Sequence, residues 1–105
     1  MKIPVEFEDL IKKALDEASQ NSTLIELISS TSFKVSGFVF EIRFRDKIVS
    51  LHQQKSRKRV YAFCYDVNYN RFDEMEAKNR IRDMIMHTYL YLANKVRHQE
   101  IELFK

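Results

Sequence analysis

The run Phe38–Arg45 constrains the fold of this chain more than any other segment. Every second position of FVFEIRFR, from Phe38 onward, is aromatic or aliphatic, and the positions between hold one valine and three charged residues. A period of two puts the apolar side chains on one face of a β-strand and the charged ones on the other. The chain must therefore contain a sheet with a buried aromatic face and other elements that cover it.

Two further strands are predicted after this one. Residues 45–47 form a short turn, 48–53 a strand, 54–58 a second hairpin connection and 59–66 a third strand. The third strand alternates aromatic with small residues, and either set fits a buried face, because small residues let a helix pack closely. The two sets are Tyr61, Phe63 and Tyr65, and Val60, Ala62 and Cys64.

The first strand is predicted to begin at Phe33, with a change of phase before Phe38. Phe33 and Val35 lie out of step with the run that follows, and the change falls at Ser36-Gly37, which contains the only glycine. One inserted residue shifts the phase of a strand and is often marked by glycine. The sequence therefore predicts a β-bulge at Ser36-Gly37.

Helices are predicted on both sides of the strands. Apolar residues recur at helical spacing over residues 5–19. A short second helix is expected over Leu24–Ser29, with Thr23 and Glu26 as its capping box. Asp73 and Glu76 form a similar box at the start of the last helix. That helix would be about 45 Å long if it continued to residue 103, so we expect it to break near residues 97–99 or to project into a partner.

These elements predict an α+β fold within a single domain, residues 1–105. The expected order is helix, short helix, three strands and helix, with a three-stranded antiparallel meander packed against the N-terminal helix and the long C-terminal helix. No apolar run approaches the roughly 18 residues of a membrane span, and the acidic N-terminus does not resemble a signal peptide. With one cysteine, Cys64, a cytoplasmic location without disulfides is expected.

Positive charge is concentrated in the predicted sheet. Residues 34–59 carry eight basic and two acidic side chains, whereas residues 60–105 carry seven of each. Such a region suits contact with nucleic acid or with an acidic protein surface; alternatively, it is a solvated face that keeps the sheet from aggregating. The candidate binding residues are Arg43, Arg45, Lys47, Lys55, Arg57, Lys58 and Arg59.

The order helix, three strands, helix resembles the double-stranded-RNA-binding domain over roughly residues 33–92. In that family a Lys-Lys-x-Ala-Lys motif at the start of the last helix places lysines on phosphates. Ala77 and Lys78 match this motif, and Asp73 and Glu74 stand where the leading lysines would be. The resemblance implies the fold, and Lys78 as a phosphate contact.

The third strand is similar to the core octet of the RNA-recognition motif, in which a basic residue precedes aromatic side chains that stack on bases. Arg59 is the basic residue, but the glycine of that motif is missing. The similarity implies base stacking by Tyr61, Phe63 and Tyr65. The alternative is that these rings belong to the core or to a dimer interface.

A stretch of the last helix resembles the motif of the HEPN ribonucleases. Arg82 and His87 match its arginine and histidine, Asp83 stands at its polar position, and Tyr89 fits a common follower. The resemblance implies cleavage of RNA by general acid–base chemistry, with the arginine steadying the phosphate. That family is helical throughout, whereas the middle third of this chain predicts strands, and Asp83 and His87 are also an ordinary i,i+4 pair.

The last helix is apolar on nearly all sides between residues 84 and 93. One sheet cannot cover two apolar stripes, so either the first helix or a second copy of the chain must cover the other. A homodimer is predicted, with an interface formed by Met86, Tyr89, Leu90 and Ala93.

The sequence predicts no enzymatic chemistry apart from the ribonuclease alternative at Arg82 and His87. One glycine cannot build a phosphate-binding loop, and the three histidines lack the spacing of metal ligands, so neither metal nor cofactor is expected. The leading prediction is a small non-enzymatic protein that binds nucleic acid through a basic hairpin surface. The alternatives are an adaptor or inhibitor of the kind that phages and mobile elements encode, bound to an acidic partner through the same surface, and, third, the ribonuclease.

Overall fold

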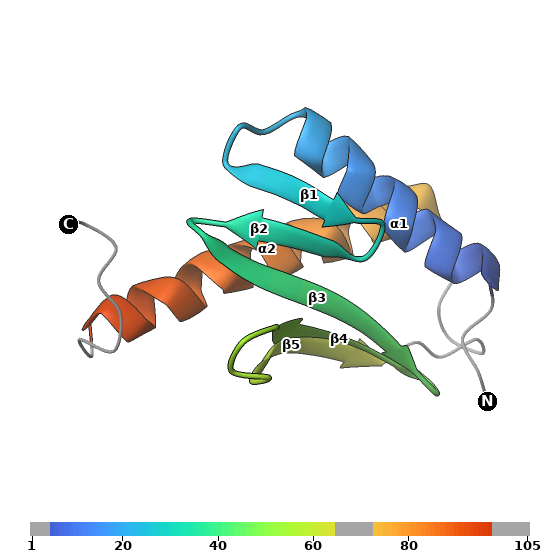
Figure 1. Ribbon diagram of the computed structural model, residues 1–105. Coiled ribbons are helices and arrows are strands. Elements are labelled where there is room, and N and C mark those ends of the chain that lie inside the picture. Colours follow the sequence, from blue (N-terminus) through green and yellow to red (C-terminus); the bar gives the residue numbers. More distant parts are fainter. Residues whose placement is uncertain (1–4, 65–72, 98–105) are drawn as a thin grey trace.

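In sequence, five antiparallel strands follow an N-terminal helix and precede a C-terminal helix, and both helices pack on the same face of the sheet (Figure 1). The computed structural model describes residues 5–64 and 73–97. The elements are α1 (Val5–Gln20), β1 (Ile25–Ser29), β2 (Ser32–Val35), β3 (Phe38–Arg45), β4 (Ile48–Gln53), β5 (Arg59–Cys64) and α2 (Glu74–Arg97). The α+β class is confirmed, but the expected number of three strands is wrong.

The strands form one meander in the order β1-β2-β3-β4-β5. The alternation predicted for β3 is confirmed, because Phe40 and Ile42 are buried whereas Arg43 and Arg45 are exposed. Residues that lie opposite each other on neighbouring strands share a face of the sheet: Phe40 lies opposite Phe33 on β2, and Ile42 lies opposite Leu51 on β4. One face of the sheet is therefore apolar from edge to edge.

The short helix expected at Leu24–Ser29 is wrong, since this segment contains strand β1. Ile25 faces the core at 7% exposure and Glu26 is exposed, which is the period of two of a half-buried strand. β1 pairs with β2, placing Ile25 opposite Val35. This pairing between strands outweighs the local helix-capping signal, because a strand is stabilised by neighbours that a short window of sequence does not contain.

Ser36-Gly37 is a hairpin turn instead of the expected bulge. Both residues have positive φ values, 51° and 84°, as a two-residue type I′ turn requires. The turn pairs Val35 with Phe38, so these two side chains share a face of the sheet. The change of phase seen in the sequence is thus a reversal of the chain, and it turns the expected first strand into β2 and β3.

The two helices begin and pack as their sequences predict. α1 buries Phe7, Ile11 and Leu15 along one side. Asp73 caps α2, since its Oδ1 accepts a hydrogen bond of 2.9 Å from the backbone N–H of Glu76. This cap confirms the predicted start of the last helix; its continuation toward residue 103 and a break at 97–99 lie at or beyond the end of the described residues.

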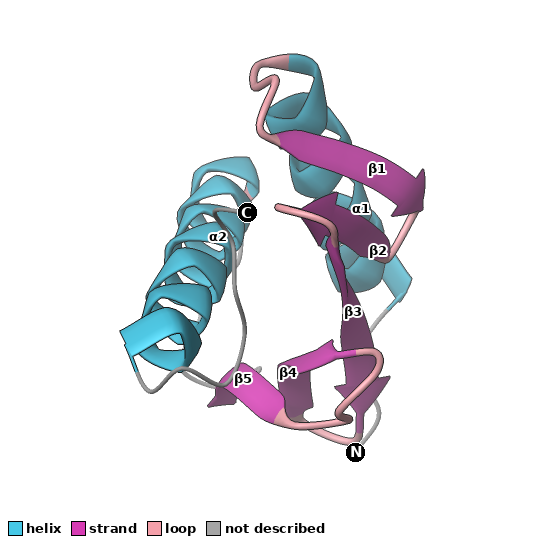
Figure 2. Cartoon of the chain, turned by 60° about the vertical axis from the view of Figure 1, so that its left-hand side comes forward, coloured by secondary structure: helices cyan, strands magenta, loops and turns pink. Residues whose placement is uncertain are grey.

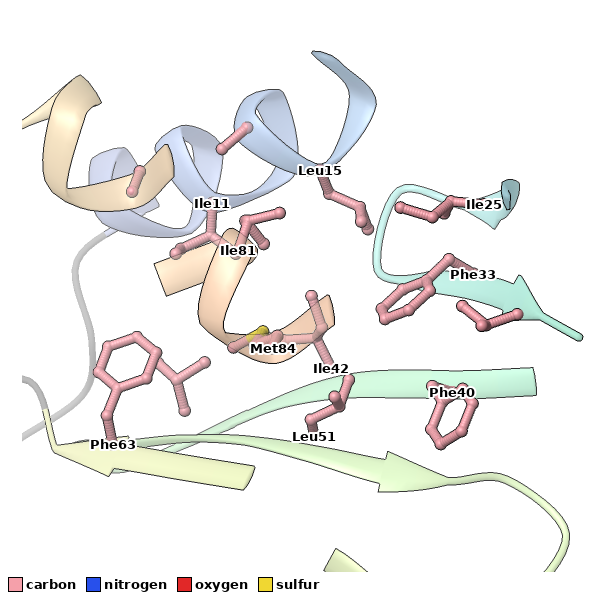
Figure 3. Close-up of a cluster of buried hydrophobic side chains, with 14 of the residues drawn as sticks. Ile11, Leu15, Ile25, Phe33, Phe40, Ile42, Leu51, Phe63, Ile81 and Met84 are labelled. Atoms are coloured by element: carbon pink, nitrogen blue, oxygen red, sulfur yellow. The ribbon is translucent and has the colours of Figure 1, made fainter. Parts of the chain in front are cut away.

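Both helices contribute to a single core on the apolar face of the sheet (Figure 3). Ile11 and Leu15 of α1 and Met84 of α2 point toward Phe33, Ile42 and the other sheet residues labelled there. The sheet curves from β1 to β5 around α2 (Figure 2). The buried core residues are Phe7, Ile11, Ala14, Leu15, Ile25, Phe33, Val35, Phe40, Ile42, Val49, Leu51, Phe63, Ala77, Ile81, Met84 and Leu92.

The opposite face of the sheet has no covering layer among the described residues. Charged or small side chains occupy most of it, such as Glu41 and Arg43 on β3 and Ala62 on β5. We call this surface the open face. None of the described helices is long and apolar enough to cross a lipid bilayer.

Candidate functional site

All seven basic residues singled out from the sequence are exposed, and they lie on or at the ends of the open face. We call them together the basic face. Two extend from β3, one lies in the β3–β4 turn, three lie in the β4–β5 turn and one begins β5. In chain order they are Arg43, Arg45, Lys47, Lys55, Arg57, Lys58 and Arg59.

The basic face follows β4 from one turn to the other. β4 has six residues, so at about 3.3 Å per residue its two ends lie roughly 20 Å apart. Arg45 and Lys47 are at one end, and the β4–β5 turn is at the other. Arg43 lies between them, opposite Ser50 in the register. The positive side chains therefore form a row along the strand instead of a single cluster.

Most of this charge has no acidic partner among the described residues. Arg43 makes an ion pair with Glu41, with 3.3 Å between Nε and Oε1. The other six residues of the basic face make no ion pair with any residue in the described parts of the chain. Their charges are balanced by solvent ions, which a polyanion can displace.

The β4–β5 turn, which holds the densest positive charge, is anchored at both ends. The Gln53 N–H donates to the Lys58 carbonyl over 3.0 Å, and the Arg57 N–H donates to the Gln53 carbonyl over 2.8 Å. The side-chain carbonyl of Gln53 accepts hydrogen bonds from the hydroxyls of Ser56 (2.8 Å) and Tyr91 (2.7 Å). Gln53 is only 5% exposed, so this network holds the turn against α2.

A histidine fastens the same turn from the open face. The carbonyl of Arg57 can only accept a hydrogen bond, so the Nδ1–H of His52 donates to it, over 3.4 Å. In the neutral ring Nε2 then accepts from the Ser50 hydroxyl, over 2.9 Å. Arg57 itself has φ of 60°, a left-handed conformation that is uncommon outside glycine, asparagine and aspartate. The basic side chains thus extend from a turn of defined shape.

The aromatic residues of β5 do not form part of the open face. Phe63 is 8% exposed, packs edge-on against Phe7 and lies under the Arg80 guanidinium at 4.5 Å. The Tyr61 hydroxyl accepts from Arg80 Nη1 over 3.0 Å and donates to Asp83 over 3.4 Å. Both rings lie beneath the helices, which is not where a stacked base would meet the open face. Tyr65 lies outside the described residues.

Arg82 and His87 lie on different sides of α2. Arg82 is exposed beside α1 and lines a groove with Glu17 and Ile85. His87 packs on the ring of Tyr61, with centroids 4.6 Å apart, and its Nδ1–H donates to the Asp83 carbonyl over 2.7 Å. Within one chain they do not converge on a common site for RNA cleavage.

The two residues that match the double-stranded-RNA-binding domain face α1. Ala77 is fully buried, and the Lys78 ammonium is 3.4 Å from Glu17 Oε2. Lys78 is therefore directed toward a carboxylate and lies away from the open face. No group of three or more potential metal ligands occurs within residues 5–64 and 73–97.

The stripe predicted as a dimer interface is uncovered. Met86 and Leu90 are 53% and 59% exposed, Tyr89 is 37% exposed and Ala93 is also exposed. α1 packs against the opposite side of α2, where Ala77 and the other core residues lie. The apolar stripe consequently has no partner among the described elements.

No family model, no curated protein and no solved structure matches this chain.

Two features of the site are absent from the residues predicted from the sequence. Lys34 on β2 lies on the open face, opposite Val39 and next to Glu26 in the register, and its position in the alternating run SFKV was the signal for it. The anchor formed by Gln53 and Tyr91 joins residues 38 positions apart. No local pattern announces such a contact.

Proposed function

We propose that this protein is a non-enzymatic nucleic-acid-binding protein that contacts the phosphate backbone through its basic face. The observation that carries the proposal is a set of six exposed cations that make no ion pair with the described residues. They lie at the two ends of β4, with Arg43 between them, on one side of the sheet while both helices cover the other. Phosphate contacts need accessible positive charge at defined positions, and they do not need a pocket. The anchored β4–β5 turn supplies defined positions at one end of the row.

The length of the row suits a polyanion. Phosphates repeat about every 3.4 Å along one strand of duplex DNA, so a row of roughly 20 Å lies beside several of them at once. Each neutralised phosphate releases condensed counterions, which makes the affinity depend steeply on salt.

The test is a salt titration of binding to a labelled 20-base-pair duplex, followed by fluorescence anisotropy. If all six unpaired cations contact phosphates, the plot of log K against log salt concentration has a slope of about −5. The test variant replaces Lys55, Arg57 and Lys58 with glutamine, and we expect its slope to be less steep by roughly 2 to 3.

The matched control replaces Lys12, Lys13 and Lys78 with glutamine, which removes the same charge from the helical layer. Exposed ion pairs contribute little to stability, so this variant should fold. We expect a slope within about one unit of the wild type. Equal losses in the two variants would mean that only net charge matters, and would contradict a defined interface.

An acidic protein surface is the second candidate partner. Ile48 is 39% exposed and Val39 is partly exposed on the same open face. A protein interface can bury such apolar groups, whereas phosphates cannot use them. Absence of duplex or single-strand binding at 50 mM salt would reject the nucleic-acid proposal and leave this one, in which the chain acts as an adaptor or inhibitor.

A further inference from the structure

Strand β1 is an exposed edge of the sheet, protected only by its short length, by Glu26 and by a shift in its register with β2 between Leu27 and Ser29. It lies at one end of the strand order, and no described strand pairs with its outer side. Edge strands expose unpaired backbone groups, which natural proteins commonly shield with lysine, proline or a covering element. β1 contains neither lysine nor proline, and two aliphatic side chains are exposed along it, Leu24 at 66% just before the strand and Ile28 at 49% within it.

An apolar groove lies beside the start of this edge. It has a volume of about 560 Å³, within the range of roughly 300–1,000 Å³ typical of ligand pockets. Both helices and the start of β1 line it with aliphatic or aromatic side chains. The principal apolar lining residues are Ala14, Ala18, Leu24, Ile25, Ile85 and Tyr89.

The charges around the groove leave one cation available. Glu17 and Lys78 also line it, and they pair with each other over 3.4 Å. Arg82 lines the same groove, is exposed and makes no ion pair with any residue in the described ranges. An occupant that matches this environment is apolar and carries a carboxylate.

We propose that an extended, acidic segment of a partner protein binds at this edge. Its backbone pairs with β1 as a sixth strand, an apolar side chain enters the groove, and an aspartate or glutamate side chain faces Arg82. Backbone pairing at a sheet edge supplies affinity, and a pocket for alternate side chains supplies specificity. A peptide fits better than a small molecule, because the groove adjoins a strand with unpaired backbone groups.

This site is separate from the basic face. β1 and β5 are opposite edges of the sheet, and the groove is lined by the helical layer whereas the basic face is on and around the other face. The proposal therefore does not depend on nucleic-acid binding, and each site can be inactivated alone.

The experiment selects nine-residue peptides from a random displayed library on the full-length protein. Counter-selection uses the double variant Leu24→Lys, Arg82→Glu, with circular dichroism to show that it is folded. We expect enriched peptides to alternate apolar residues and to contain aspartate or glutamate. Nuclear magnetic resonance shifts caused by the synthesised peptide should fall in residues 24–29 and along the groove.

Charge reversal then tests the contact with Arg82. We expect Arg82→Glu to weaken binding of the selected peptide about tenfold or more, and Arg45→Glu, the same change on the open face, to alter it less than twofold. Exchange of the peptide's acidic residue for lysine should restore binding to Arg82→Glu.

Three results would overturn the proposal. One is a library that yields no peptide enriched on the wild type over the double variant. Another concerns two N-methylated versions of the selected peptide, in which the methyl groups block the backbone N–H groups along one edge of the peptide strand or along the other. If both versions bind as tightly as the unmodified peptide, the peptide does not pair with β1. The third is a failure of charge exchange to restore binding, which removes Arg82 from the site.

Discussion

Arg57 combines a charged side chain with a backbone conformation that its side chain does not favour. Three non-glycine residues in the described ranges have positive φ, and Ser36 and Asp46 are of the small polar kind found in such turns. Unlike asparagine or aspartate, arginine has no short polar side chain to hydrogen-bond its own backbone in this conformation, which costs an ordinary residue about 1–2 kcal/mol. The bonds to Gln53 and His52 hold it in place.

We expect Arg57→Gly to raise the free energy of unfolding by about 1 kcal/mol, because glycine adopts positive φ without steric cost. The same variant should bind duplex more weakly than the wild type, since a charge is lost from the basic face. Urea denaturation followed by circular dichroism measures the first effect, and anisotropy measures the second. Lys58→Gly is the control: its φ is not positive, so we expect no gain in stability. If Arg57→Gly were no more stable than Lys58→Gly, the backbone of Arg57 would not be strained.

At the same scale, the sequence could not show which side of β5 is buried. Aromatic and small residues alternate there, and either set is consistent with a packed face. The decision rests on contacts of Tyr61 and Phe63 with Arg80 and Asp83, residues about 20 positions away on α2. Burial of these rings favours phosphate contacts over base stacking as the way this protein would hold nucleic acid.

Among the elements, those with long and regular patterns were predictable. The apolar residues of β3, β4 and both helices recur often enough, at strand or helix spacing, to predict these elements from the sequence. β1 has only five residues, and its neighbour β2 has four. The alternating pattern of β1 is too short to outweigh the helix-capping signal at Thr23 and Glu26, and that of β2 is too short to show that it is a strand separate from β3. Their identity depends on pairing, as with Phe33 and Phe40, whose rings stack with centroids 6.0 Å apart.

The two helices are joined at their surface by an ion pair between Lys13 and Glu74, with 3.1 Å between Nζ and Oε1. The hydrogen bond from Lys13, together with its charge, lowers the pKa of Glu74 below its ordinary value of 4.5. The hydrogen bond and charge of Glu74 raise the pKa of Lys13 above 10.5. Because the pKa of Glu74 is lower in the folded protein than in the unfolded chain, its ionised form stabilises the fold at pH values above the unfolded pKa. This stabilisation is lost as the pH falls through the folded pKa. Because the pKa of Lys13 is higher in the folded protein than in the unfolded chain, its charged form stabilises the fold at pH values below the unfolded pKa. This stabilisation is lost as the pH rises through the folded pKa.

We therefore expect Glu74→Gln to lower the melting temperature slightly between about pH 5 and pH 10, and to have no such effect well below the folded pKa of Glu74. The effect is small because both side chains are more than half exposed. Thermal melts of the wild type, Glu74→Gln, Lys13→Met and the double variant, at pH 2.5 and pH 7, measure the coupling. Additive effects at pH 7 would show that the pair contributes nothing.

For the whole molecule, charge is separated by layer. Residues 25–64, the strands and their turns, carry eight basic and three acidic side chains, whereas α1 and α2 together carry seven basic and eight acidic. One side of the protein is therefore positive and the other nearly neutral. The nearly neutral side also holds the exposed apolar residues of α2, so it is the side better suited to contact a second copy.

We expect the wild type to dimerise through the stripe Met86, Tyr89, Leu90 and Ala93, because this removes exposed apolar surface from water. In such a dimer the two sheets lie outside and both basic faces remain free. Leu90→Glu should yield a monomer in sedimentation equilibrium over a range of protein concentrations. Ile28→Glu, a similar change at the edge strand, should leave the dimer intact.

The monomeric variant should keep the salt slope per chain, because each basic face acts alone, but should no longer bring two duplexes together. A wild type that stays monomeric at all concentrations would show that the stripe is not a dimer interface.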